Sequence, residues 1–200
     1  GTMLGDLEGR PPLTSAGACR GDAAVLTGGA AIEATALIAR EKGEALATTL
    51  AADVLERARN FLSDPGISIV EAAGVARDAG ARALHDVTEG GVVTGLWEMA
   101  EASGLGLDVD ADAVPVRDAT RAVCEAVGID PLEAIGSGAL VAAVAEEKAD
   151  ALLGALAEAG IDAARVGTFG AEGGGRRITR GGRTLPLVPP DRDAIAALYE

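Results

Sequence analysis

The chain has 200 residues, of which 48% are hydrophobic, and carries a formal net charge of −14 with an isoelectric point near 4.4. This length is enough to bury one good core, which predicts one domain or one domain with an appendage. The acidic charge and an aromatic content of 2% argue against a nucleic acid or an anionic membrane as partner, since those partners need a basic face or a platform for stacked bases.

The sequence also lacks a membrane-spanning run, a signal peptide and a cysteine motif for disulfides or metal. No run reaches the roughly 18 apolar residues of a membrane-spanning helix, and the opening GTMLGDLEGR has neither the basic start nor the apolar core of a signal peptide. Cys19 and Cys124 lack CxxC spacing, and the chain has one histidine, so we expect no disulfide framework and no metal site. Free cysteines predict a cytoplasmic protein, because the cytoplasm keeps thiols reduced.

The first predicted elements are a linker and a strand–turn–helix unit. Residues 1–22 are rich in turn-forming residues, and residues 2–5 have the character of a strand end. We therefore interpret this opening as the end of a preceding structural element. A buried strand is predicted at 23–26. The sequence Thr27-Gly28-Gly29 then leads into a helix over 31–42, which Gly43 ends.

The next elements are two helices and a second strand–turn–helix unit. Helices are predicted at 51–62 and 70–79, where Ser63-Asp64-Pro65-Gly66 and Gly80 end them. A short strand then leads through His85-Asp86-Val87-Thr88 and Glu89-Gly90-Gly91 into a helix. The apolar residues of that helix recur at three- and four-residue spacing, at Val92, Leu96, Met99 and Ala100.

The second half of the chain continues the alternation of strands and helices. Strands are expected at 105–109, 139–144 and 161–168, helices at 117–127, 146–159 and 194–199, and a hairpin at 176–180 and 184–187. Helices that alternate with strands predict an α/β sandwich, and the hairpin makes its sheet mixed rather than strictly parallel.

The loop before the helix at Val92 has the composition of an anion site. Asp86 and Thr88 can accept hydrogen bonds from N–H groups at the helix start, and Gly90 and Gly91 leave the main chain bare there. Free amide donors and the positive end of the helix dipole suit a phosphate group. A capped helix after a tight turn explains these residues equally well. For the similar Gly28-Gly29 sequence, a plain strand-to-helix turn is the simpler interpretation.

Other candidate sites have plainer interpretations. Consecutive strand residues point to opposite faces, so His85 does not pair with Asp86 and is interpreted as a packing histidine. Asp86 can face the loop and cap the helix, hold an attacking group or reach a metal ion. The acidic run 108–112 lacks the glycine and terminal glutamate of an EF-hand and is interpreted as a solvated strand edge.

The chain has one cluster of basic residues in its acidic sequence. Its members are Arg176, Arg177, Arg180 and Arg183. They could contact phosphates or an acidic partner, but an exposed hairpin face is the simpler interpretation. The sequence contains no GxSxG motif, no P-loop ending and no GxGxxG after a strand, and we assign no catalytic residue.

Four segments, in one order along the chain, carry a family resemblance. The segment HDVTEGG, with VTGLWEMAEASGLGLDVDADAVPV after it, resembles the superfamily of AIR synthase (PurM), HypE and selenophosphate synthetase, and within it the C-terminal domain of HypE-like AIR-synthase-related proteins. The same resemblance extends to GDAAVLTGGAAIEATALIARE, VGIDPLEAIGSGALVAAV and RVGTFGAEGGGRRI.

The resemblance implies an α/β (α+β) fold, namely a three-layer α/β/α sandwich of the PurM C-terminal-domain type with a mixed sheet. Residues 1–22 then correspond to a linker and the remnant of a missing N-terminal ATP-binding domain, and residues 23–200 to the AIR synthase-related C-terminal domain. Family members dimerise and use ATP and Mg²⁺, which the N-terminal domain mostly binds. We therefore expect a homodimer, and ATP and Mg²⁺ are implied for the full-length protein, while neither ligand is assigned to this chain alone.

The resemblance also implies which residues face the ligand. The Asp-x-Thr-x-Gly-Gly segment, which faces the cleft between the two domains, corresponds to Asp86, Thr88, Gly90 and Gly91. The loops of Gly28 and Gly29 and of Ser137 and Gly138 occupy matching positions and have weaker claims on the ligand.

The implied function is the C-terminal domain of an ATP-dependent AIR-synthase/HypE-like enzyme, which forms the phosphate-side wall of an interdomain active site and is inactive alone. One alternative is a non-catalytic module that binds phosphate or a metabolite or serves dimerisation. Another is a HypE-type dehydratase of hydrogenase maturation. That alternative is weaker because HypE ends in a cysteine that carries the transferred group, whereas this sequence ends Ala-Leu-Tyr-Glu. The acceptor substrate is not indicated.

Overall fold

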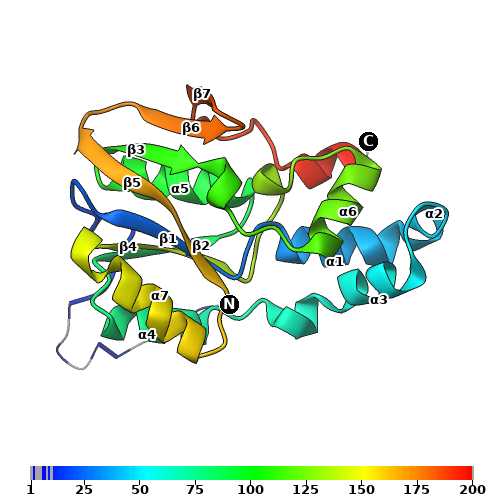
Figure 1. Ribbon diagram of the computed structural model, residues 1–200, viewed down its shortest axis with the longest axis horizontal. Coiled ribbons are helices and arrows are strands. Elements are labelled where there is room, and N and C mark those ends of the chain that lie inside the picture. Colours follow the sequence, from blue (N-terminus) through cyan, green and yellow to red (C-terminus); the bar gives the residue numbers. More distant parts are fainter. Residues whose placement is uncertain (1, 3–5, 8, 10, 200) are drawn as a thin grey trace.

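A seven-stranded sheet forms the centre of the protein in the computed structural model, which describes residues 2, 6–7, 9 and 11–199 (Figure 1). The strand order is β2-β4-β1-β5-β3-β6-β7. The strands are β1 (Ala23–Thr27), β2 (Ala83–Val87), β3 (Leu105–Asp110), β4 (Ala139–Val144), β5 (Ala163–Glu172), β6 (Arg176–Arg180) and β7 (Arg183–Pro186). The strand end expected at residues 2–5 lies outside the described residues, apart from Thr2.

The pairing of the strands confirms the mixed sheet. Neighbouring strands run antiparallel, except that β3 and β6 run parallel.

The acidic run 108–112 was expected on a strand edge, and that expectation is wrong. The β6–β7 hairpin returns to pair with β3, so β3 lies inside the sheet while Asp108 and Asp110 still point to solvent.

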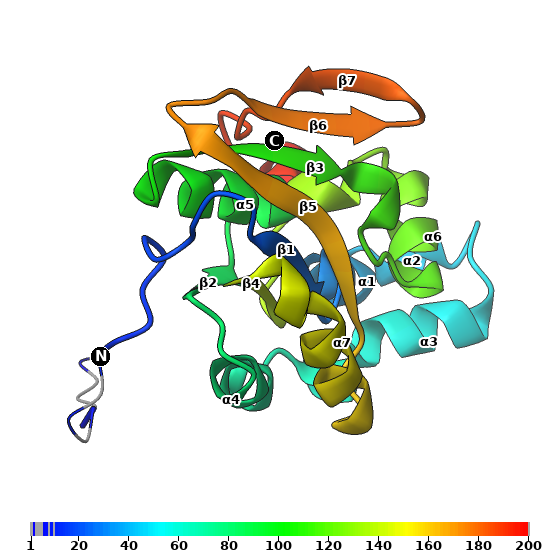
Figure 2. The same ribbon diagram turned by 60° about the vertical axis from the view of Figure 1, so that its left-hand side comes forward.

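Helices cover both faces of the sheet and extend beyond one end of it (Figure 2). Helix α5 lies on one face, α4 and α7 lie on the other, and α1, α2, α3 and α6 gather at the end. The helices are α1 (Ile32–Glu41), α2 (Gly43–Leu46), α3 (Ala52–Asn60), α4 (Val70–Asp78), α5 (Gly91–Ala102), α6 (Asp118–Val127) and α7 (Ala149–Glu158). The three expected layers are therefore present, together with a helical lobe. No helix among the described residues has the length and apolar character needed to cross a membrane.

The central strands explain why the layers form. In β1, Ala23 and Val25 pack with α4 and α7, whereas Ala24 and Leu26 pack with α5. Every residue of β1 and β4 is buried. Because side chains alternate between the two faces of a strand, a strand that is apolar at every position must be covered on both sides.

The structure differs from the expected helices at their ends. The helix predicted at 146–159 begins as a 3₁₀ turn, η4 (Glu146–Lys148), before α7, and the helix predicted at 194–199 is a 3₁₀ helix, η5 (Ala194–Tyr199). After α1, Gly43 starts the short helix α2 instead of only ending α1. Such ends are weakly specified by apolar periodicity, because a single turn carries too few residues to show a period.

The two cysteines have opposite environments, which gives a first testable prediction. Cys19 is exposed and Cys124 is buried in α6. Burial, aided by the negative charge of Asp130, raises the pKa of the Cys124 thiol to about 12. At pH 8 we therefore expect iodoacetamide to modify Cys19 alone in the native chain, because the thiolate is the reactive form. Mass spectrometry should find no modification in native Cys19→Ser protein and one after denaturation, whereas rapid native alkylation of Cys124 would contradict the buried position.

Candidate functional site

The loop that links β2 to α5 has the expected strand–turn–helix form but not the expected cap. Gly90 is the N-cap of α5 with φ of 71°, and no side chain of the loop caps the helix. The Gly90 N–H instead donates to Oδ2 of Asp193 at 2.7 Å, and the Gly91 N–H donates to the Thr88 carbonyl oxygen at 3.1 Å. Of the alternatives that the sequence left open, capping of α5 by Asp86 or Thr88 is therefore not what the structure shows. A glycine at the N-cap brings no side-chain oxygen, so the C-terminal segment supplies the acceptor.

Three loops meet where β1 and β2 end and β4 begins. In the sheet register, Thr27 of β1 and Val87 of β2 lie opposite Leu140 and Ala139 of β4, so the adjoining turns are neighbours. We call residues 28–29, 88–91 and 136–138 the loop cluster. It contains all the site residues expected from the sequence except Asp86, which lies on β2 two residues before it.

Close main-chain approaches hold the loop cluster together. The Gly136 N–H donates to the Thr88 carbonyl oxygen at 3.2 Å. A Cβ atom on Gly28 would lie 2.4 Å from the carbonyl oxygen of Gly138, and one on Gly91 would lie 2.6 Å from the carbonyl oxygens of Leu132 and Ala134. These loops require glycine because backbone atoms fill the space of a side chain.

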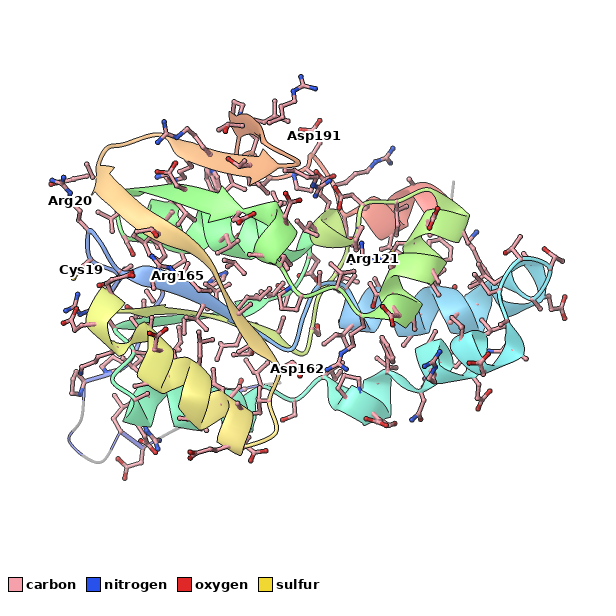
Figure 3. All side chains as sticks on the ribbon, in the orientation of Figure 1. Cys19, Arg20, Arg121, Asp162, Arg165 and Asp191 are labelled. Atoms are coloured by element: carbon pink, nitrogen blue, oxygen red, sulfur yellow. The ribbon has the colours of Figure 1, made fainter. Side chains whose placement is uncertain are left out.

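Most of the main-chain donors in the loop cluster are already used. The Gly28 N–H donates to the carbonyl oxygen of Asp162 at 2.7 Å, and the Gly29 N–H donates to that of Thr27 at 2.9 Å. Asp162, labelled in Figure 3, precedes β5, and its carboxylate pairs with Arg117 at 2.6 Å. The turn at residues 28–29 therefore has the bonding of a strand-to-helix connection, with both of its glycine amides satisfied inside the chain.

The side chains of the predicted site are more available than its amides. Asp86 and Thr88 are exposed, and Ser137 is half-buried. Within the part of the chain that the structure describes, the Asp86 carboxylate and the hydroxyls of Thr88 and Ser137 have no hydrogen-bond partner. One carboxylate and two hydroxyls are therefore free to contact a ligand bound at the loop cluster. Among the described residues, no group of three His, Cys, Asp or Glu side chains could hold a metal ion.

The arginine cluster lies on the β6–β7 hairpin, where acidic side chains of the same chain neutralise most of it. Arg176 pairs with Glu101 at 2.7 Å, Arg177 pairs with Asp108 at 2.7 Å, and Arg180 pairs with Asp130. The hydrogen bond to Asp130 is the main reason that the pKa of Arg180 is raised. This surface therefore offers less positive charge to a phosphate than its sequence suggests.

His85 does not pair with Asp86, as the alternation of strand residues predicted. It is half-buried, and its ring nitrogens lie within hydrogen-bond distance of Ser15 and Glu98. Sequence reasoning missed both of these partners and the contact of Asp193 with Gly90. Each contact joins residues 13 to 103 positions apart, and no local motif connects them.

Comparisons with known proteins identify the family and the fold of the chain. Residues 20–180 match the family model for AIR synthase related protein, C-terminal domain. The chain is 32% identical over 182 residues to carbamoyl dehydratase HypE of Bradyrhizobium diazoefficiens, covering 84% of this chain and 50% of that protein. It also resembles the crystal structure of E. coli HypE, a hydrogenase maturation protein, with a TM-score of 0.73, 28% identity, and coverage of 91% of this chain and 54% of that one.

A further similar structure contains a nucleotide. It is the hydrogenase maturation protein HypE in complex with ATP, with a TM-score of 0.67 and 25% identity over 92% of this chain and 55% of that one. The chain thus spans about half the length of the relatives that it matches.

Proposed function

The chain belongs to the family of AIR synthase related proteins through their C-terminal domain, and on that basis we propose that it forms the phosphate-side wall of the active site of a HypE-like, ATP-dependent enzyme. In this proposal an N-terminal ATP-binding domain supplies the opposite wall, the full-length protein is a cytoplasmic homodimer, and this chain alone does not turn over ATP.

The observation that carries the proposal is the carboxylate held at the start of α5. The Gly90 N–H binds an oxyanion, Oδ2 of Asp193, at 2.7 Å. A carboxylate and a phosphate place similar charged oxygens at a helix N-terminus, where amide donors and the helix dipole favour both. This contact supports our proposal that a phosphate oxygen binds where Asp193 Oδ2 lies and that bound phosphate displaces the carboxylate.

The free side chains around Gly90 suit the rest of such a ligand. The hydroxyls of Thr88 and Ser137 can donate to phosphate oxygens, and the exposed Asp86 carboxylate can reach a Mg²⁺ ion or orient the acceptor. Bound Mg²⁺ would neutralise phosphate charge. The ion takes six oxygen ligands, and the described residues contain no group of three His, Cys, Asp or Glu side chains that could hold it, so in this proposal ATP and a second domain supply the remaining ligands.

The proposal predicts the behaviour of the isolated chain toward ATP. We expect no release of phosphate from Mg-ATP above the background rate, because the chain offers only part of the ligand set. A coupled phosphate-release assay would check this, with Asp86→Ala and the remote Asp108→Ala as matched variants. Turnover that is lost in Asp86→Ala and kept in Asp108→Ala would show a complete site in this chain and contradict the proposal.

A further inference from the structure

Outside the loop cluster, three side chains from separate parts of the chain form one hydrogen-bonded series. Oγ of Ser15, which precedes β1, lies 2.8 Å from Nδ1 of His85 on β2. The other ring nitrogen, Nε2, lies 2.9 Å from Oε2 of Glu98 on α5. We infer that Ser15, His85 and Glu98 form a nucleophilic site for acyl transfer, with carboxylic esters as the class of substrate.

The order of the three groups fixes their roles. An ionised carboxylate only accepts hydrogen bonds, so Glu98 holds the ring N–H at Nε2. The Nδ1 atom of neutral His85 then carries the lone pair and accepts from the Ser15 hydroxyl. A hydroxyl nucleophile, a base within reach of it and an acidic group that orients the base are the arrangement required for covalent acyl transfer.

The fold holds the base in place while leaving it accessible. A Cβ atom on Gly95 of α5 would lie 3.6 Å from Cδ2 of His85, an ordinary contact distance, so the imidazole ring packs directly against this helix. The His85 side chain is 18% exposed and that of Glu98 is 49% exposed. The ring is thus packed against α5 and still reachable from solvent.

Hydrogen bonds also fix the main chain of the segment that contains Ser15. Oγ of Ser103 donates to the Ser15 carbonyl oxygen at 3.2 Å and accepts from the Ala18 N–H at 3.3 Å. A Cβ atom on Gly17 would lie 2.1 Å from the Arg82 carbonyl oxygen, so the segment runs directly against the residue before β2. Ser15 is therefore held in place without a secondary-structure element of its own.

The reaction balances with water as the second substrate. Ser15 Oγ attacks the carbonyl carbon while its proton moves to Nδ1 of His85. The ester C–O bond then breaks, and the same proton passes to the leaving alkoxide. Water, deprotonated by His85, attacks the acyl-serine and releases the carboxylic acid and free Ser15. Ser15 and His85 are the catalytic residues, and Glu98 is a positioning residue.

The test uses the full chain, a fluorophosphonate probe and p-nitrophenyl esters. We expect one covalent adduct, located on Ser15 by mass spectrometry, and ester hydrolysis that falls about 100-fold in Ser15→Ala and in His85→Gln. Ser63→Ala is the matched control, because Ser63 is exposed in the segment after α3 and has no hydrogen bond to Ser15, His85 or Glu98, so it should keep both the adduct on Ser15 and the hydrolysis.

Substitutions of Glu98 distinguish a positioning role in catalysis from a purely structural role. Glu98→Gln should lower kcat about tenfold with KM unchanged, and Glu98→Asp should recover part of the loss. Circular dichroism would establish that each variant is folded. The inference is overturned if the folded wild-type chain forms no adduct on Ser15. It is also overturned if the adduct forms at the wild-type rate in His85→Gln. If His85→Gln does not fold, the same comparison is made with Glu98→Gln.

Discussion

Gly91→Ala is expected to lower the free energy of unfolding by about 3 kcal/mol, because two penalties coincide at this residue. Gly91 has φ of 63°, a left-handed conformation that costs a residue with a side chain about 1–2 kcal/mol. The new Cβ atom would also lie 2.6 Å from the carbonyl oxygens of Leu132 and Ala134. Overpacking of this kind typically costs about 1–3 kcal/mol. Urea denaturation of both proteins measures the difference.

Gly104 provides the matched control for this substitution. It follows α5, has φ of 68°, and a Cβ atom there would meet nothing within 4 Å. Gly104→Ala should therefore show the conformational cost alone, about 1–2 kcal/mol. Equal losses for the two variants would mean that the 132–134 segment does not press on the start of α5, and the close packing of the loop cluster would be refuted.

Asp193→Ala is expected to raise the affinity of the chain for inorganic phosphate about tenfold or more, since it removes the carboxylate that occupies the Gly90 N–H. A charged cap at a helix N-terminus contributes about 1–2 kcal/mol, and 1.4 kcal/mol corresponds to a factor of ten in binding. Isothermal titration calorimetry compares the two proteins. The variant should also unfold at lower urea concentration, because the cap is lost.

Asp193→Asn tests whether charge or shape matters at this position. Asparagine caps helices about as well as aspartate, but it carries no charge. We expect phosphate to displace the asparagine side chain more readily than it displaces aspartate in the wild type, and less readily than it displaces water in Asp193→Ala. Identical phosphate affinities for the wild type, Asp193→Ala and Asp193→Asn would show that the start of α5 is not where phosphate binds.

The layers of the fold were predictable because they depend on local apolar patterns. Residues 139–144 are apolar at every position, and Val92, Leu96, Met99 and Ala100 recur at helical spacing. In the structure the first segment is the buried strand β4, and the second set lies buried on α5. Here hydrophobic burial alone specifies which face is covered, so the sequence is sufficient.

The chemistry around these layers was less predictable because it depends on contacts between distant residues. Asp193 lies 103 positions from Gly90, and Ser15 lies 70 positions from His85. Polar pairs of this kind leave no periodic pattern, and they form only once the sheet order is established. For the same reason the place of β3 inside the sheet followed from its long-range pairing with β6 and not from its own alternating residues.

The most direct test of the phosphate-side wall is a titration of the ¹⁵N-labelled chain with inorganic phosphate and then Mg-ATP, followed by amide NMR spectroscopy. We predict that the largest shift changes fall on Gly90, Gly91 and their neighbours in the loop cluster, accompanied by changes at Asp193 as its carboxylate leaves. Changes confined to the arginines of the β6–β7 hairpin, or no changes at millimolar ligand in both the wild type and Asp193→Ala, would contradict the proposed function.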